Sequence, residues 1–189
     1  SKIPKFTLVI LGISDFLKNN FVYLLIGIIL AIVVIRYLYK NVKVFRTLIQ
    51  WVLMHMPVFG NVIIYNEVTT FTKTFASLLA HNVFITDSME ILSKITNNEI
   101  YKRIIRKTLE NLGKGDSIST AFKGEWAVPV VAYEMIVTGE TTGQLGQMME
   151  KVATHFQSLH KNVINQMKSL IEPIIMVFLA IVVGIILLS

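Results

Sequence analysis

The chain has 189 residues, of which 53% are hydrophobic and only 16% are charged, and its formal net charge is +6. This composition is too apolar for an ordinary water-soluble domain. Cysteine is absent, which excludes disulfides and thiolate metal sites. The excess of apolar residues is concentrated in residues 19–35 and 173–188, and neither stretch contains a charged residue. The composition therefore predicts a membrane protein with two spans.

The first 39 residues are predicted to hold an external segment and a transmembrane helix. Residues 1–18 carry apolar side chains at helical spacing after Pro4. We expect a short helix there on the outer membrane face, with a loop as the alternative. Residues 19–39 are predicted to form the first transmembrane helix, because a bilayer span needs about 20 predominantly apolar residues.

Residues 40–168 are long enough to form one domain with its own core, and their pattern is helical. The first helix is expected from Val44 to His55, with several apolar residues on one face: Phe45, Leu48, Ile49, Val52 and Met56. A Met-Pro-Val-Phe-Gly stretch at residues 56–60 breaks this helix.

The next helix is expected to begin with Asn61 as its N-cap and to end at residues 80–82, where Asn82 tolerates the left-handed conformation. Its predicted buried stripe consists of Val68, Phe71, Phe75 and Leu78. Thr86 or Asp87 is the expected N-cap of a shorter helix that ends at Ile95.

A further helix is expected over residues 99–112, followed by a turn at residues 113–116. Its inward side chains are predicted to be Tyr101, Ile105, Leu109 and Leu112. Ser117 is the expected cap of a short helix that ends at Phe122, and Pro129 is expected to open another helix that ends at Thr138. No stretch alternates with a period of two. The predicted fold class is therefore all-α, a membrane protein with a roughly six-helix cytoplasmic bundle between two transmembrane helices.

A glycine-containing turn at residues 139–145 is predicted before the last helix. The apolar residues of this helix recur at spacings of four and three, which places them on one face: Leu145, Met149, Val152, Phe156, Leu159, Val163, Met167 and Leu170. The same helix is expected to continue into a second transmembrane helix over residues 169–189. Pro173 should kink it at the membrane edge. Glu172 beside it is either a functional ionisable group in the membrane or a carboxylate that reaches interfacial water.

Basic residues are concentrated at both membrane ends of the middle domain: Arg36, Lys40, Lys43 and Arg46 follow the first span, and Lys161 and Lys168 precede the second. Cytoplasmic segments next to membrane spans are enriched in lysine and arginine. The sequence therefore predicts that residues 40–168 lie in the cytoplasm.

No motif in the sequence indicates catalysis. The glycines near residues 113–115 and 139–143 are not followed by the Gly-Lys-Ser/Thr that a phosphate-binding loop requires. His155 and His160 are five positions apart, which does not give them a shared metal-binding face, and no His-Glu-x-x-His occurs. We therefore expect no enzyme, no cofactor and no metal site.

Two features are candidate partner-binding sites. Lys102, Arg103, Arg106 and Lys107 form a basic face on one predicted helix. This face is either solvated or a docking patch for an acidic partner or anionic lipid headgroups. Glu140 lies in the predicted turn, where its carboxylate either caps a helix N-terminus or contacts a partner or a divalent cation.

Four short motifs in this order carry a family resemblance: Phe71-x-x-x-Phe75-Ala76-Ser77-Leu78-Leu79, Gly115-Asp116-Ser117-Ile118-Ser119, Gly139-Glu140-x-x-Gly143-x-Leu145 and Leu170-Ile171-Glu172-Pro173. Through them the chain resembles the inner-membrane platform family of type II secretion systems and type IV pili, the GspF/PilC family, over essentially its whole length. The resemblance implies the C-terminal half of such a protein. The chain departs from the family in having Ala80-His81-Asn82 where a small residue and glycine are usual before Val83, and Asn82 can meet the same backbone need.

The resemblance implies a non-enzymatic platform in the bacterial inner membrane. It would couple a cytoplasmic hexameric assembly ATPase to the insertion or extraction of pilins or pseudopilins. The implied partners are this ATPase, prepilins or pseudopilins, other inner-membrane assembly proteins and further copies of the chain in a homo-oligomer, with no nucleic acid. A divalent ion near the Gly-Glu turn is also implied, and we do not assign it to Glu140. A membrane signalling adaptor with a helical cytoplasmic domain is the alternative function, but the short external segment is a poor sensor.

Overall fold

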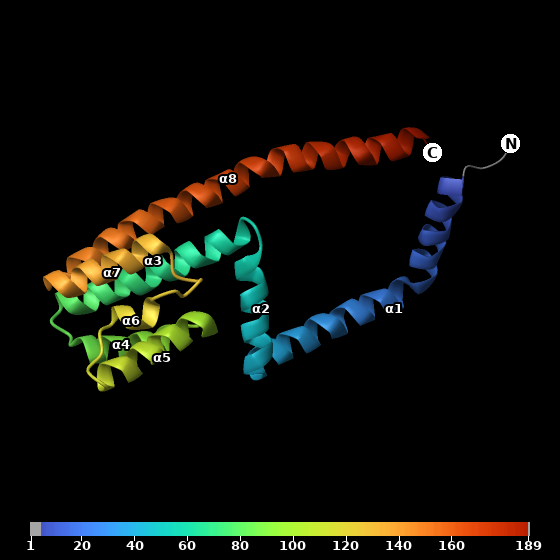
Figure 1. Cartoon of the computed structure of the whole chain (residues 1–189). Helices are drawn as coiled ribbons and strands as arrows, with labels where there is room; N and C mark the ends of the chain where they lie inside the picture. The colour runs from blue at the N-terminus through green and yellow to red at the C-terminus, as the bar shows by residue number, and fades with distance from the viewer. Residues whose placement is uncertain (1–4, 189) are drawn as a thin grey trace. The chain divides into compact units, whose positions relative to one another are not determined.

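The computed structural model describes residues 5–188, and all regular structure in this range is helical (Figure 1). The predicted all-α class is confirmed. The helices are α1 (Lys5–Asn41), α2 (Lys43–His55), α3 (Phe59–Ala80), α4 (Ile85–Ile95), α5 (Glu99–Gly113), α6 (Ser119–Phe122), α7 (Val130–Thr142) and α8 (Leu145–Leu188). The described residues fall into two compact units. We call residues 47–169 the bundle, and the residues up to 46 together with those from 170 onward the apolar unit.

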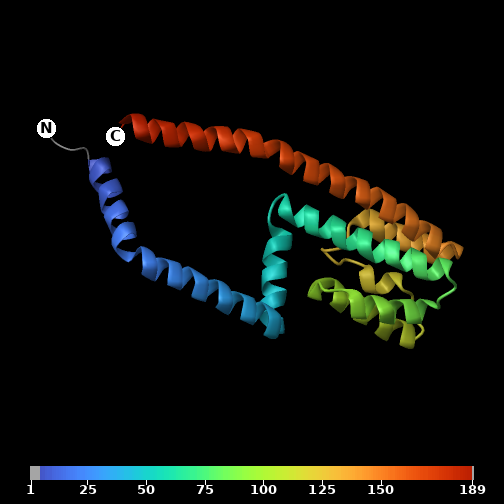
Figure 2. The same cartoon turned by 180° about the vertical axis from the view of Figure 1, so that it is seen from behind.

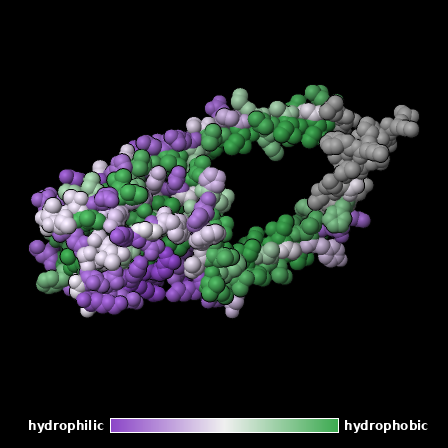
Figure 3. Space-filling model, in the orientation of Figure 1, coloured by the Kyte–Doolittle hydropathy of each residue, from purple (hydrophilic) through white to green (hydrophobic). Residues whose placement is uncertain are grey.

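The apolar unit contains segments that are long and apolar enough to cross a membrane. One is Asn19–Asn41 of α1, and α8 contains another. Hydrophobic surface is visible along both segments in Figure 3. α2 and α3 also pass this test as a pair, but they are bent by 111° at their junction. The helix expected in the first 18 residues is present from Lys5 onward, yet it is not separate, because no proline or glycine interrupts residues 13–26 before α1 continues into the span.

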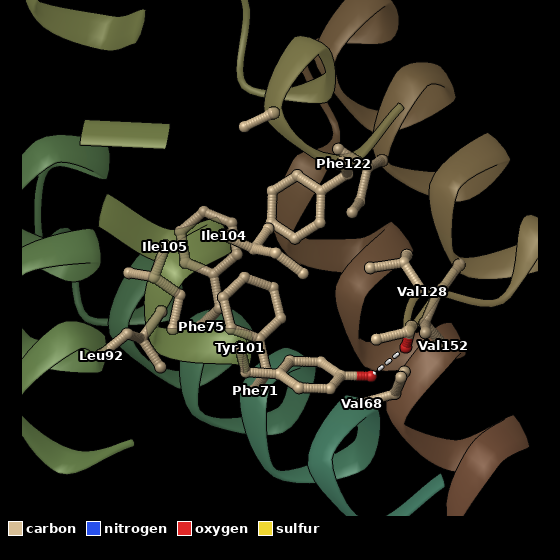
Figure 4. Close-up of a cluster of buried hydrophobic side chains, with 14 of the residues drawn as sticks. Val68, Phe71, Phe75, Leu92, Tyr101, Ile104, Ile105, Phe122, Val128 and Val152 are labelled. Carbon is tan, nitrogen blue, oxygen red and sulfur yellow. Dashed lines mark hydrogen bonds between the residues drawn. The ribbon is translucent and has the colours of Figure 1, made fainter. Parts of the chain in front are cut away.

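The bundle closes around one hydrophobic core, part of which is shown in Figure 4. Its largest fully buried apolar side chains come from five helices: Phe75, Met89, Leu92, Ile104, Ile105, Ile136, Met149 and Val152. The stripe predicted for α3 is confirmed, with Val68, Phe71 and Phe75 buried and Leu78 partly buried against them. The apolar seam of α8 is buried from Leu145 to Phe156, and Leu170 at its far end is 53% exposed.

Figures 1 and 2 both show α3 beside the N-terminal part of α8, and α4 beside α5. A ring contact and a histidine contact are among those that join α3 to α8. The ring centroids of Tyr65 and Phe156 are 5.5 Å apart, and His160 Nδ1 lies 3.1 Å from the carbonyl oxygen of Val62. The first half of α8 is therefore an integral helix of the bundle.

Two helices end as the sequence predicts, through one residue with positive φ. Asn82 has φ 58°, its N–H donates to the carbonyl of Leu79, and the next N–H, of Val83, donates to Leu78 at 3.0 Å. This pair of bonds is the Schellman motif, which satisfies the last carbonyls of a helix. Gly115, with φ 83°, ends α5 in the same way and confirms the turn predicted there.

The predicted helix starts are less accurate. α3 begins at Phe59, two residues before the expected cap Asn61, because a tight γ-turn precedes it. Val58 has φ 69° and ψ −56°, and the N–H of Phe59 donates to the carbonyl of Pro57 at 2.9 Å. At this corner the backbones of α2 and α3 approach so closely that a Cβ on Gly60 would lie 2.2 Å from the carbonyl oxygen of Met54.

α4 begins at Ile85, so neither Thr86 nor Asp87 is its cap. The N-cap position is Phe84, and no side chain caps this helix. Val83 is the last residue of the Schellman motif of α3, and α4 follows directly after it. The N–H of Ser88 donates to the carbonyl of Phe84 at 2.8 Å.

The turn predicted at residues 139–145 is shorter in the structure, because α7 continues to Thr142, Gly143 leaves the helix with φ 69°, and α8 begins at Leu145. Gly139 is buried inside α7. A Cβ on it would lie 2.8 Å from Cα of Leu145. This glycine therefore permits the close approach of α7 and α8, and does not form the turn.

Candidate interaction surface

The basic face predicted on residues 102–107 lies on α5. Asn98 caps this helix, because its side-chain oxygen accepts hydrogen bonds from the N–H groups of Ile100 and Tyr101 at 3.0 and 3.3 Å. Ile104 and Ile105, each 1% exposed, turn the opposite face into the core. The four basic residues are therefore displayed on the outside, where Lys102 is partly buried and the other three are exposed: Arg103, Arg106 and Lys107.

Glu125, which no sequence motif indicates, forms ion pairs with two of the four basic residues of this face. Its carboxylate lies 2.9 Å from the guanidinium of Arg103 and 3.7 Å from the ammonium of Lys107. These pairs are at the surface and contribute only about 0–1 kcal/mol each. For Lys102 and Arg106 the structure shows no ion pair among residues 5–188. Glu125 is 22 positions from Arg103, and no local pattern marks this contact.

Tyr101 holds the loop of Glu125 against α5. Its side chain is 2% exposed and its hydroxyl donates to the carbonyl of Ala127 (Figure 4). Burial, and to a smaller extent the charge of Glu67, raises the pKa of Tyr101 above its ordinary value. The phenol therefore stays protonated and continues to donate this bond at physiological pH.

Glu140 lies in α7, and its carboxylate caps a different helix. One oxygen accepts from the N–H of Ile118 at 2.6 Å, and the other accepts from the N–H of Ser119 at 3.2 Å. These N–H groups stand at the N-terminus of α6, where a negative charge is favoured. Ser117, the predicted cap, instead contacts the hydroxyls of Ser119 and Thr120 at 3.2 and 3.0 Å. Glu140 therefore has the capping geometry, and its contact with a partner or cation stays a prediction.

Replacing Glu140 by alanine is expected to lower the free energy of unfolding by about 1–3 kcal/mol, because two partly buried N–H groups lose their acceptors. Urea unfolding of the detergent-solubilised chain, followed by tryptophan fluorescence, measures the change. The matched control is Glu134→Ala, an exposed glutamate on the same helix, which should stay within about 0.5 kcal/mol of the parent. Equal effects of the two substitutions would contradict the capping role.

Glu172 and Pro173 lie inside α8, which runs from Leu145 to Leu188 as one helix. The predicted continuity of the helix through this point is confirmed. Both residues are exposed. The kink at Pro173 and a functional role for Glu172 stay predictions.

The histidines contact carbonyls or neighbouring rings. Nδ1 of His55 and of His81 lies 2.8 and 2.7 Å from a carbonyl oxygen one helical turn back, and the ring of His155 meets the ring of Phe156 edge-on at 5.1 Å. Across residues 5–188, no group of three or more His, Asp or Glu side chains is placed to hold a metal ion.

Residues 71–189 match the family model described as type II secretion system protein F, and this range includes α5, Glu140 and the whole of α8. The chain belongs to this family. The membership expected from the motifs is thus confirmed. The match covers more than half of the chain and begins within α3, at Phe71, while α1 and α2 lie outside it.

Curated relatives of this chain are named as proteins of type IV pilus assembly or of type II secretion systems. The type IV pilus assembly protein PilC of Pseudomonas aeruginosa is 25% identical over 184 residues, which are 97% of this chain and 49% of the relative. PilC of Thermus thermophilus is 27% identical over 187 residues, 98% of this chain and 46% of the relative. The type II secretion system protein F of P. aeruginosa is 25% identical over 187 residues, 99% of this chain and 46% of the relative. The chain spans about half the length of these relatives, in agreement with the expected half of a longer protein.

Proposed function

We propose that this chain is part of an inner-membrane platform for type IV pilus or type II secretion assembly, and that it couples a cytoplasmic hexameric ATPase to the insertion or extraction of pilins or pseudopilins. Membership of the protein F family supports the platform role. The observation that carries the coupling is α8. Its first residues are buried in the bundle core, and the same uninterrupted helix contains an apolar segment long enough to cross a membrane. In this proposal a force applied to the bundle reaches the membrane along this one helix.

The bundle lies in the cytoplasm in this proposal, because basic residues flank the ends of both candidate spans. Prepilins or pseudopilins, other inner-membrane assembly proteins and further copies of the chain are its proposed partners at the membrane. The basic face of α5 is the proposed docking site for the ATPase. Lys102 and Arg106 support this assignment, since they have no ion-pair partner among the described residues.

Reversing the charge of both Lys102 and Arg106 to glutamate is expected to weaken binding of the cognate ATPase by about 5–30-fold, corresponding to about 1–2 kcal/mol for two surface charges. The loss should be larger at low salt, where screening is weaker. Binding of the purified ATPase to the detergent-solubilised chain gives the dissociation constant at two salt concentrations.

The matched control reverses Lys151 and Lys161, two exposed lysines on α8, and gives the same change in net charge. This control should bind normally. Reversal of Arg103 and Lys107 is a less direct test, because it also breaks both ion pairs with Glu125. Normal binding after reversal of Lys102 and Arg106 would refute the docking assignment.

A further inference from the structure

The side of α2 that faces the rest of the bundle carries Gln50 and Met54, and a broader apolar face of the same helix is left outside. Gln50 accepts a hydrogen bond from the N–H of Glu99 at 2.8 Å, and Met54, one turn further on, is 4% exposed. On the opposite side, Leu48, Trp51 and Val52 are 58%, 49% and 46% exposed. These three residues share one helix face, at i, i+3 and i+4. The corner after α2 adds further exposed apolar side chains: Met56, Val58 and Phe59.

A cluster of aromatic rings continues this surface. The ring of His55 lies between Trp51 and Trp126, with centroid distances of 4.2 Å to each. The two tryptophans come from α2 and from the loop before α7, and they are the chain's only two. Trp126 is 42% exposed. Tryptophan is enriched at membrane–water interfaces, where its apolar ring and its polar N–H are both accommodated.

The chain length keeps this surface close to the membrane. The candidate span in α1 ends at Asn41, and α2 begins at Lys43. Trp51 follows eight residues later, so it lies at most about 20 Å from the end of the span at any angle of α2. The headgroup layer is about 5–8 Å thick on each side of the hydrocarbon core. Trp51 reaches this layer when α2 lies along the membrane plane.

The charge of the residues around α2 indicates what kind of partner would cover its apolar face. Residues 36–66 contain four basic residues and no acidic residue: Arg36, Lys40, Lys43 and Arg46. A helix with an apolar face that carries tryptophan and with flanking basic residues is typical of binding at the interface of an anionic bilayer. A second copy of the chain would bring the same positive charge to this face.

We infer that the surface formed by Leu48, Trp51, Val52 and Trp126 rests in the headgroup region of an anionic phospholipid bilayer. The bundle then has a third point of attachment to the membrane besides the two candidate spans. This attachment requires no ATPase and stands independently of the coupling proposed above.

Single-tryptophan variants of the full chain in lipid nanodiscs test this inference. Trp126→Phe leaves Trp51 as the only tryptophan, and Trp51→Phe leaves Trp126. In discs of phosphatidylcholine and phosphatidylglycerol, lipids brominated in the acyl chains should cause a large loss of fluorescence from either residue, while iodide in the water should cause little. Helical circular dichroism confirms that the variants are folded.

The control places the reporter at the other end of the bundle. Phe84 is 78% exposed and follows α3, a helix of 22 residues that is about 33 Å long and begins beside α2. In a chain without Trp51 and Trp126, Phe84→Trp should be quenched by iodide and not by brominated lipid.

Substitutions on the α2 face test its contribution directly. Leu48→Glu together with Val52→Glu should reduce the bromine quenching of Trp51, as should replacement of phosphatidylglycerol by phosphatidylcholine. Three results would overturn the inference. Iodide quenching of Trp51 equal to that at position 84 would place the surface in water, protection from both quenchers would mean that protein covers it, and equal bromine quenching in the two lipid compositions would exclude an anionic requirement.

Discussion

Inserting four helix-forming residues after Gln166 is expected to abolish assembly of the pilus or pseudopilus. The insertion lengthens α8 by about 6 Å and rotates everything beyond it by about 40° relative to the bundle. The residues that anchor α8 in the core, Leu145 to Phe156, lie before the insertion and keep their register. The bundle should therefore stay folded, the apolar segment should still insert, and the ATPase should still bind. Sheared surface pili, or secretion of a type II substrate, measure assembly in cells that carry the variant.

Two further insertions separate coupling from general damage. A flexible Gly-Ser insertion after Gln166 should fail as well, because it interrupts the continuous helix. The same four helix-forming residues after Lys123, in the exposed turn between α6 and α7, should be tolerated, since surface loops accept added length at little cost. Normal assembly from both Gln166 variants would mean that α8 only tethers its two parts, and the proposed coupling would be wrong.

Replacing Phe156 by alanine is expected to lower the free energy of unfolding by about 3–5 kcal/mol. The side chain is 2% exposed and its ring meets that of Tyr65 on α3 at 5.5 Å. Removing it leaves a cavity at the contact that joins α8 to the rest of the core. A loss of this size is a large part of the 5–15 kcal/mol that is typical of folded domains.

Urea titration of the detergent-solubilised chain gives this change, with the tryptophans of the bundle as the fluorescent reporters. Gln157→Ala provides the control, because Gln157 is exposed on the same turn of α8. It should stay within about 0.5 kcal/mol of the parent. If Phe156→Ala proved equally mild, α8 could not be anchored in the bundle as the structure shows.

The helical periodicity of the sequence was sufficient to predict the class of the fold and most of its core. The stripe on α3 and the seam on α8 were both found this way, because a buried helix face repeats every three or four residues whatever it packs against. The end of α3 was also predictable, since the need for a left-handed residue falls on Asn82 itself. Each of these features depends on residues that are close in the sequence.

The errors arise where the structure depends on contacts between distant residues. The local pattern places Gly139 in a turn, but its role is to let the backbone of α8 approach α7. The cap of α6 is supplied by Glu140, 22 positions from Ile118, so the local capping rule chose Ser117 instead. The same limit explains why Glu125 was missed beside the basic face.

The apolar face predicted on α2 shows a different limit. Periodicity found Leu48 and Val52 on one face, yet both are exposed, and Gln50 and Met54 meet the bundle instead. A hydrophobic pattern shows that a helix face avoids water, but it does not say whether protein or lipid covers that face.

The participation of α8 in both the core and a candidate span bears on the biogenesis of the protein. During synthesis Val68, Phe71 and Phe75 leave the ribosome long before Phe156, which follows them by about 80 residues. Until α8 emerges, the core lacks the side chains that α8 contributes, and the nascent bundle is a target for chaperones and proteases. The apolar end of α8 is synthesised soon after these core residues. Closure of the core and delivery of this segment to the membrane therefore belong to the same late interval of translation, so a ribosome that stalls before α8 leaves a product that is neither folded nor fully anchored.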